Sequence, residues 1–124
     1  MTARTASWHG THWCRPTTRL AIYLRDGMAC AYCGATVEDG TLLTLDHLMP
    51  DSRGGSNAPT NLVTACRRCN CARGNRTVRS FCRATAEYLN HDAKAETIER
   101  HVRNCARRQL PRDEARELVR RRAM

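Results

Sequence analysis

Cys30-Ala31-Tyr32-Cys33 and Cys66-Arg67-Arg68-Cys69 are the two segments that decide the fold of this 124-residue chain. Each is a C-x-x-C pair, and 32 residues, 34–65, separate them. Two residues between cysteines allow both sulfurs to reach one ion at about 2.3 Å, and four thiolates complete a tetrahedral zinc shell. Because four protein ligands leave no position for water, we expect Cys30, Cys33, Cys66 and Cys69 to bind a structural zinc.

Four further cysteines leave alternatives open. Cys71 could replace Cys69 as a ligand, although its spacing does not suit a C-x-x-C pair. Cys82 and Cys105 fall on apolar helix faces and are expected to be small core residues. A second metal site is a weaker alternative, because scattered groups in a flexible arm rarely form one. It would use three N-terminal residues: His9, His12 and Cys14.

The charge of the chain indicates a polyanionic partner. It carries 21 basic and 12 acidic residues, which gives a net charge of +9 and a pI of about 9.7. Such a surplus attracts nucleic acid. GC-rich coding is an alternative source of the arginine-rich composition, but it does not create the charge excess. Residues 1–9 contain no apolar leader, and no apolar run reaches the roughly 20 residues of a membrane span. We therefore expect no membrane association and a cytoplasmic, reducing compartment, in which paired cysteines bind metal.

The sequence divides into three regions. Residues 1–15 lack periodicity and are expected to form a flexible basic arm, whereas 16–77 should form the core and 78–124 a helical extension. The predicted core elements are a helix from Pro16 with Leu20, Ala21 and Leu24 on its apolar face and Gly27 after its end, strands over 41–49 and 61–65, a flexible loop around Gly54-Gly55, and a helix from Cys66 to Arg73.

The extension is expected to contain three helices. Their predicted markers are Phe81, Thr85, Tyr88 and Leu89, then Ile98, Val102 and Cys105 with Asp92 as N-cap, and then Pro111, Ala115, Leu118 and Val119. Because these apolar stripes look like packing faces, we expect a region that is separable from the chemistry and could bind a protein partner.

Residues suited to phosphodiester hydrolysis stand between and beside the cysteine pairs. This reaction needs an activated water and a cation that stabilises the leaving oxygen. The imidazole of His47 can accept a proton near pH 7, and the side-chain oxygens of Asp46 and Asn70 suit a hard cation such as Mg²⁺. Neighbouring strand residues point to opposite faces, so Asp46 and His47 could flank a phosphate from two sides. Taken singly, each residue is more often an ordinary surface or capping residue.

Together these residues resemble the HNH endonuclease family, in its zinc-containing ββα-metal branch. The resemblance covers residues 20–77 and rests on the cysteine pairs, Leu45-Asp46-His47, Gly54-Gly55, Asn61-Leu62, Asn70 and Arg73-Gly74. It implies an α+β fold with a small ββα-metal core stapled by the four-cysteine zinc, an N-terminal helix and a C-terminal helical extension. The implied cellular setting is a prokaryotic or phage-infected cell.

The resemblance also implies an activity and a role for each residue. The chain would be a DNA endonuclease that uses one divalent ion, Mg²⁺ or Mn²⁺, and leaves 5′-phosphate and 3′-hydroxyl ends. His47 would be the general base, Asp46 and Asn70 would hold the ion, and Asn61 would bond across the loop to hold the His47 backbone. Asn70 stands where some members carry histidine, which favours Mg²⁺ or Mn²⁺ over a transition metal.

Double-stranded DNA is the expected partner. The candidate phosphate contacts lie on or after the helix that follows Cys66: Arg67, Arg68, Arg73, Arg76 and Arg79. A solvated basic face is the alternative interpretation of these arginines. Two other functions remain open at this point, namely a zinc-knuckle module that binds nucleic acid without catalysis, and an interaction adaptor.

Overall fold

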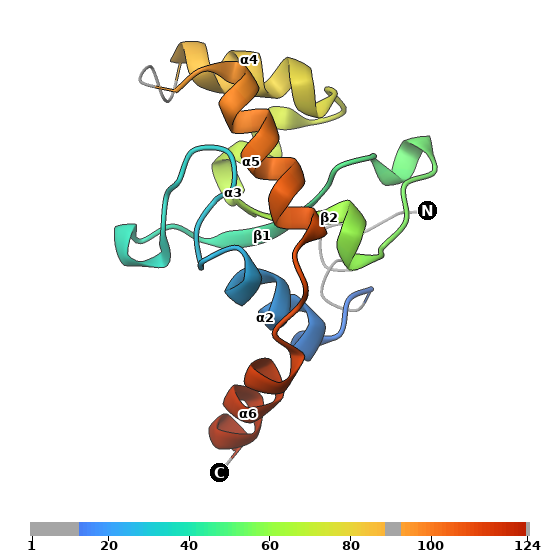
Figure 1. The fold of residues 1–124 in the computed structure, drawn as a ribbon, viewed down its shortest axis with the longest axis vertical. Coiled ribbons are helices and arrows are strands. Elements are labelled where there is room, and N and C mark those ends of the chain that lie inside the picture. The colour runs from blue at the N-terminus through green and yellow to red at the C-terminus, as the bar shows by residue number, and fades with distance from the viewer. Residues whose placement is uncertain (1–12, 89–92, 124) are drawn as a thin grey trace.

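A two-stranded antiparallel sheet lies at the centre of residues 13–88 and 93–123, which the computed structural model describes (Figure 1). Strand β1 (Leu43–His47) pairs with β2 (Leu62–Cys66), and helix α3 (Arg67–Arg73) follows β2 directly. The two strands and α3 form a ββα unit within an α+β fold, as the sequence predicts. Strand β1 is two residues shorter at each end than the predicted range 41–49. Strand β2 is shifted by one residue from the predicted range 61–65.

Strand β2 is enclosed on every side. All of its residues are buried, and one edge pairs with β1. At the other edge the Thr64 amide donates to Asp26 Oδ2 over 2.8 Å, and the Ala31 amide donates to the Thr64 carbonyl over 2.9 Å. The register places Asp46 opposite Val63. The chemistry-bearing end of β1 is therefore fixed against the best protected strand in the described part of the chain.

Helix α2 (Pro16–Arg25) begins with proline at its first turn and is followed by Gly27 at φ +79°, as predicted. Its buried face differs from the predicted stripe, because Ile22 and Arg25 are buried and Leu24 is only half-buried. The Arg25 guanidinium forms a buried ion pair with Asp26. It also donates to main-chain carbonyls of three other segments: Pro59, Leu62 and Ala106. Arg25 thus joins α2 to β2 and to the C-terminal half of the chain.

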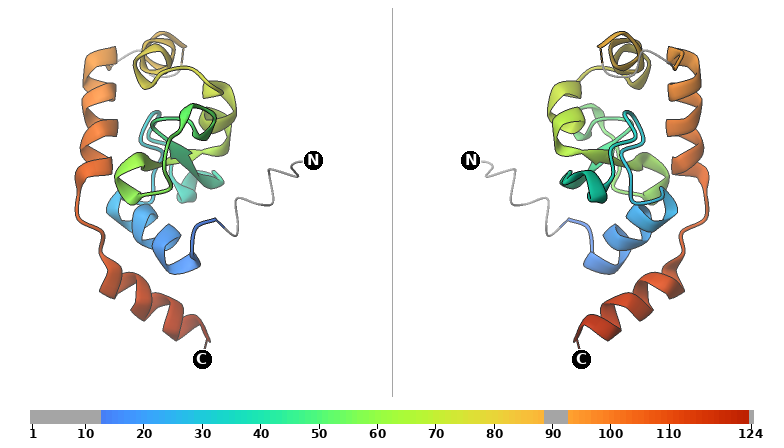
Figure 2. Two further views of the ribbon diagram at one scale, coloured as in Figure 1. Left: turned by 90° about the vertical axis from the view of Figure 1, so that its right-hand side faces the viewer. Right: turned by 90° about the vertical axis from the view of Figure 1, so that its left-hand side faces the viewer.

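The predicted boundary at residue 77 does not separate two cores. Helices α4 (Val78–Tyr88) and α5 (Ala95–Arg107) pack against each other, and α5 also packs on β2 (Figure 2). One hydrophobic cluster contains zinc-pair cysteines together with residues of these helices, such as Phe81, Val102 and Cys105. The stripe on α5 is therefore used inside the molecule. The α5 part of the predicted extension therefore shares its core with the zinc-pair segment, and a role of the extension in binding a protein partner stays a prediction.

The segments outside the central sheet differ in part from the sequence expectations. Cys14 is buried beside Ile22, so the arm does not extend to residue 15; His9, His12, Leu89 and Asp92 lie outside the described residues. Tyr88, a predicted packing residue, is 70% exposed. Helix α6 (Arg112–Ala123) packs against α2 through buried Ala115. No helix in the described ranges is long and apolar enough to span a membrane.

Candidate active site and zinc centre

The four predicted zinc ligands converge on one point. The sulfurs of Cys30, Cys33, Cys66 and Cys69 all lie within 4.8 Å of one another. Around a tetrahedral zinc with bonds of about 2.3 Å, sulfurs lie about 3.8 Å apart. The distance from Cys33 Sγ to Cys66 Sγ is 3.8 Å. The cluster therefore fits a structural zinc, and the exposed Cys71 lies outside it.

The cluster already has the chemistry of a cation site. The Cys33 amide faces Cys30 Sγ at 3.5 Å, and the Cys69 amide faces Cys66 Sγ at 3.4 Å. Hydrogen bonds from Cys30 and Cys69 lower the pKa of the Cys33 thiol, whereas the shared proton raises the pKa of Cys30 to about 11. A cation bound at the centre of the cluster would favour the thiolate form of its cysteine ligands. The predicted DNA contact Arg68 is exposed and hydrogen-bonds to Cys33, which raises the pKa of the guanidinium.

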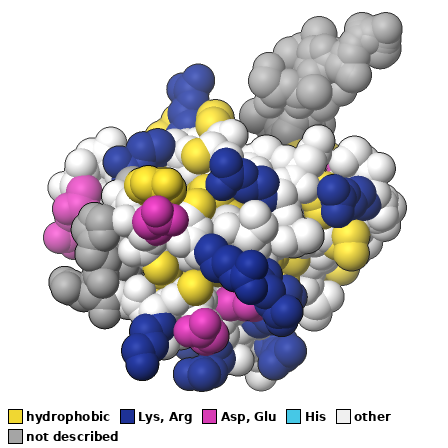
Figure 3. Space-filling model, turned by 90° about the horizontal axis from the view of Figure 1, so that it is seen from above, with side chains coloured by type: hydrophobic (Ala, Val, Ile, Leu, Met, Phe, Trp, Pro, Cys, Tyr) yellow, Lys and Arg dark blue, Asp and Glu magenta, His cyan; other side chains and the backbone are white. Residues whose placement is uncertain are grey.

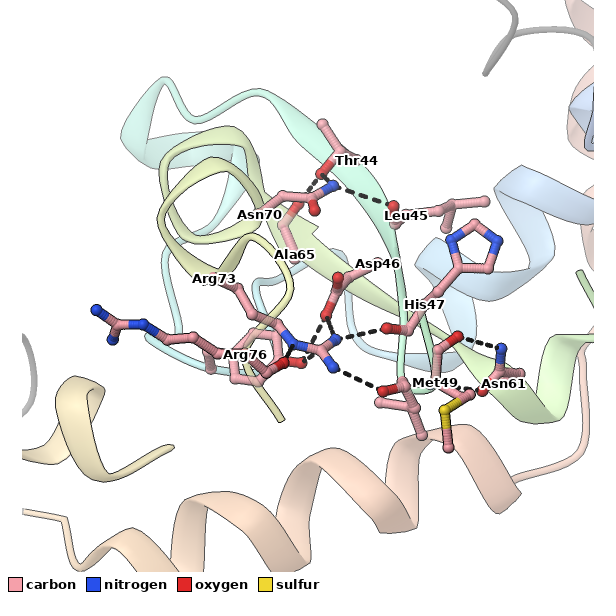
Figure 4. Close-up of polar contacts among 12 residues, drawn as sticks. Thr44, Leu45, Asp46, His47, Met49, Asn61, Ala65, Asn70, Arg73 and Arg76 are labelled. Atoms are coloured by element: carbon pink, nitrogen blue, oxygen red, sulfur yellow. Dashed lines mark hydrogen bonds and ion pairs between the residues drawn. The ribbon is translucent and has the colours of Figure 1, made fainter. Parts of the chain in front are cut away.

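The Asp46 carboxylate is held from one side. Its side chain is 7% exposed, and Oδ2 accepts hydrogen bonds from the Tyr32 hydroxyl at 2.6 Å and from Arg73 Nη1 at 2.5 Å (Figure 4). Burial, followed by the nearby Asp46 charge, raises the pKa of Tyr32 well above its usual range, so the hydroxyl keeps its proton and donates. Within the described ranges Oδ1 receives no protein hydrogen bond and remains the atom that could bind an ion.

Arg73 is not the surface phosphate contact that the sequence predicts. The residue is 1% exposed. Besides Asp46, its guanidinium donates to the Tyr32 hydroxyl and to three carbonyl groups: His47, Leu48 and Arg76. Through these hydrogen bonds the guanidinium connects α3 to the end of β1 inside the molecule. A DNA phosphate could reach it only by breaking this buried network.

The His47 ring leaves β1 on the side opposite to Asp46 (Figure 4). Its Nε2 lies 2.8 Å from Asn57 Oδ1. An amide carbonyl oxygen only accepts hydrogen bonds, so this contact places the proton on Nε2 and leaves Nδ1 able to accept one. The ring also contacts Trp13 in a tilted arrangement, with 4.9 Å between centroids and 35° between planes. Sequence reasoning missed both partners, because neither follows a local spacing rule.

The Asn61 side chain holds the loop that follows β1 through two hydrogen bonds to the backbone of Met49. Its Oδ1 accepts from the Met49 amide at 2.9 Å and its Nδ2 donates to the Met49 carbonyl at 3.1 Å. Gly55 closes the same loop, because a Cβ there would lie 1.7 Å from the Met49 carbonyl oxygen. The loop predicted to be flexible is therefore tightly folded. Asn61 reaches the backbone two residues beyond His47, and Leu48 donates to the Asn61 carbonyl at 2.8 Å.

Asn70 lies on α3 and faces β1. Its Nδ2 donates to Thr44 Oγ1 at 2.9 Å and to the Leu45 carbonyl at 3.1 Å, which leaves Oδ1 as the possible ligand atom. Asn70, Asp46 and His47 line one open surface pocket of about 330 Å³, together with Asp51. Their arrangement brings a possible base and two oxygen donors to the same solvent-accessible site. Asp51 was not singled out in the sequence.

Comparison with known proteins identifies this same segment. Residues 30–86 match the HNH endonuclease family. The CRISPR-associated endonuclease Cas9 of Actinomyces naeslundii is 43% identical to this chain over 58 residues, and that of Corynebacterium diphtheriae is 38% identical over 52 residues. These segments cover 46% and 41% of this chain but only 5% of each relative. The crystal structure of the Type II-C Cas9 enzyme from Actinomyces naeslundii aligns with a TM-score of 0.47 and 25% identity, covering 73% of this chain and 11% of that one.

Proposed function

We propose, from the match of residues 30–86 to the HNH endonuclease family, that the protein hydrolyses DNA phosphodiester bonds with the help of one divalent ion. The observation that carries the proposal is the shared pocket of Asp46, His47 and Asn70. The side chains of Asp46 and His47 leave β1 on opposite sides (Figure 4). In-line displacement requires the base and the metal ligand to lie on opposite sides of the phosphate, because the attacking water and the leaving oxygen lie on opposite sides of phosphorus.

Each side chain has one task in this reaction. His47 Nδ1 takes a proton from the attacking water while Asn57 holds the ring through Nε2. Asp46 and Asn70 offer their Oδ1 atoms to Mg²⁺ or Mn²⁺, which when bound would neutralise charge on the leaving oxygen. Asn61 keeps the backbone after His47 in place through Met49. The products are a 5′-phosphate and a 3′-hydroxyl. Zinc at the four cysteines supports this site without entering the chemistry.

The proposal is tested by incubating supercoiled plasmid with the zinc-loaded protein. We expect nicked circles with Mg²⁺ or Mn²⁺ and intact plasmid when a weak chelator removes the divalent ion but leaves the zinc bound. The ends of the nicks should be ligatable, because ligase requires 5′-phosphate and 3′-hydroxyl groups. Binding of plasmid without any metal-dependent nicking would instead support a zinc-knuckle module without catalysis.

DNA binding by this protein should be mainly electrostatic. Basic side chains spread over the face of the molecule at the α4 end, among fewer acidic ones (Figure 3). The exposed candidates for phosphate contact are Arg67, Arg68, Arg76 and Arg79. The Arg79 guanidinium also pairs with Glu99 at 3.2 Å, so we expect it to contribute less than Arg76.

Salt should weaken this binding steeply. Each neutralised phosphate contributes about −0.9 to the slope of log affinity against log salt concentration. Arg76→Ala should therefore reduce the slope by about 1, whereas Arg116→Ala, in an exposed pair with Asp113 on α6, serves as the charge-matched control. Fluorescence anisotropy with a labelled duplex between about 50 and 200 mM salt measures both slopes. Affinity that is indifferent to salt would contradict an electrostatic interface.

A further inference from the structure

Tyr32 connects the zinc cluster to the Asp46 carboxylate. It stands between Cys30 and Cys33 and is 2% exposed. Its ring packs edge-on against Phe81, with 5.0 Å between centroids and 78° between planes. The hydroxyl reaches Asp46 Oδ2 at 2.6 Å. Closing the cysteine cluster around an ion therefore fixes the backbone on both sides of the residue that holds this carboxylate.

Arg73 makes the second connection. It lies four residues after Cys69 on the same helix, and its Nη1 reaches both Asp46 Oδ2 and the Tyr32 hydroxyl, the latter at 3.3 Å. Each C-x-x-C pair therefore has one nearby side chain, Tyr32 or Arg73, that hydrogen-bonds to Asp46 Oδ2. Both side chains are buried, so their positions are set by packing and not by solvent.

This arrangement divides the two oxygens of Asp46. Oδ2 is occupied by two donors, and Oδ1 is left toward the pocket that Asn70 also lines. A carboxylate whose one oxygen is held by hydrogen bonds cannot rotate freely, and it presents the other oxygen in a fixed direction. Groups that orient a metal ligand in this way typically contribute a factor of about 10 to 100 in metal affinity or activity.

We propose that Tyr32 and Arg73 are positioning residues that hold Asp46 Oδ2, so that the folded zinc cluster sets the direction in which Oδ1 meets the divalent ion. The proposal rests on the proposed function, because it takes Asp46 as a ligand of that ion. It assigns to the zinc cluster a task in the metal site beyond stabilising the fold. It also gives the buried guanidinium of Arg73 a role that does not involve DNA.

Tyr32→Phe tests this directly, because it removes the hydroxyl and keeps the ring. Tyr23→Phe is the matched control: the Tyr23 hydroxyl also donates to β1, to the Leu43 carbonyl at 3.2 Å, but lies outside the pocket of Asp46 and Asn70. Mn²⁺ binding to the full, zinc-loaded chain is measured by electron paramagnetic resonance, with and without a DNA duplex. Plasmid nicking is measured in parallel as a function of Mn²⁺ concentration.

We expect the half-saturating Mn²⁺ concentration to rise about 10- to 100-fold in Tyr32→Phe, in both measurements, and to stay at the wild-type value in Tyr23→Phe. Zinc content should be one per chain in all three proteins. Wild-type Mn²⁺ binding in a zinc-loaded Tyr32→Phe would overturn the proposal, as would a wild-type protein that binds no Mn²⁺ with or without the duplex.

Arg73→Lys provides the second variant if Tyr32→Phe loses zinc. The lysine keeps the positive charge but cannot donate to Asp46 and the neighbouring carbonyls together, so the same rise is expected. If Arg73→Lys binds Mn²⁺ like the wild type, or if both variants lose zinc, the two residues only support the fold and the proposal fails. Weaker Mn²⁺ binding in Tyr32→Phe without nicking by any protein would reject the nuclease function and keep the positioning role.

Discussion

His47→Ala should lower the rate of plasmid nicking by about 10²- to 10⁴-fold at saturating Mg²⁺ or Mn²⁺, because it removes the proposed general base. The zinc content, thermal unfolding and DNA affinity should stay close to those of the wild type. The ring is only half-buried, its hydrogen bond is to the exposed Asn57, and the packing that is lost is its contact with the partly buried Trp13. Single-turnover nicking at saturating metal measures the chemical step apart from binding.

A matched histidine provides the control for this experiment. His101 is an exposed residue of α5 whose Nε2 lies 3.6 Å from Cys105 Sγ, and it does not line the pocket of Asp46 and Asn70. Its replacement by alanine should leave nicking unchanged. The same purification of both variants also measures the background from contaminating nucleases. Nicking by His47→Ala at the wild-type rate, above that background, would reject the mechanism proposed above.

Cys66→Ser should have the largest effect on the whole protein, since it removes one of four zinc ligands and leaves the other three incomplete. Structural zinc in small modules contributes about 10–16 kcal/mol of apparent binding energy, comparable with the about 5–15 kcal/mol that stabilises a typical domain. We therefore expect this variant to lose zinc, cooperative unfolding and nicking together. Elemental analysis and circular dichroism measure the first two losses.

Cys71→Ser is the control for the zinc site. Cys71 is exposed and lies outside the cluster, so this variant should keep one zinc per chain and the wild-type melting temperature. A Cys66→Ser protein that folds cooperatively without zinc would show that the four cysteines are not needed to hold the core. A Cys71→Ser protein that loses zinc would instead place Cys71 among the ligands.

The parts of the fold that sequence reasoning predicted well are those governed by local rules. Two residues between cysteines bring two sulfurs together whatever the rest of the chain does, and the four sulfurs do converge. Pro16 and Gly27 bound a helix because their backbone preferences act within one turn. Strand β1 follows from the Leu- and Thr-rich run that ends at Pro50, and helix α3 ends before Gly74, as expected. Each of these signals is contained in a few neighbouring residues.

The parts that were missed depend on contacts between distant segments. Arg73 looks like a surface arginine in the sequence, and only the approach of α3 to β1 buries it against Asp46. Asn57 and Trp13 meet His47 from different directions, and no fixed spacing relates them. The apolar stripe of α5 indicates that this helix packs against something, but a stripe does not identify its partner, which is the core cluster that contains the zinc-pair cysteines. The position of Tyr32 between Cys30 and Cys33 is the sequence feature that could have indicated a connection between the zinc cluster and Asp46.

The enclosure of β2 has a consequence for hydrogen exchange. Its edges are paired with β1, Ala31 and the Asp26 carboxylate, and none of its residues is exposed. Local fluctuation offers no route by which deuterium could reach such amides, so they exchange only when the whole molecule opens. The Thr64 amide should then be among the slowest in the protein. Its exchange rate would report global opening directly, whereas amides of exposed turns would exchange through small local motions.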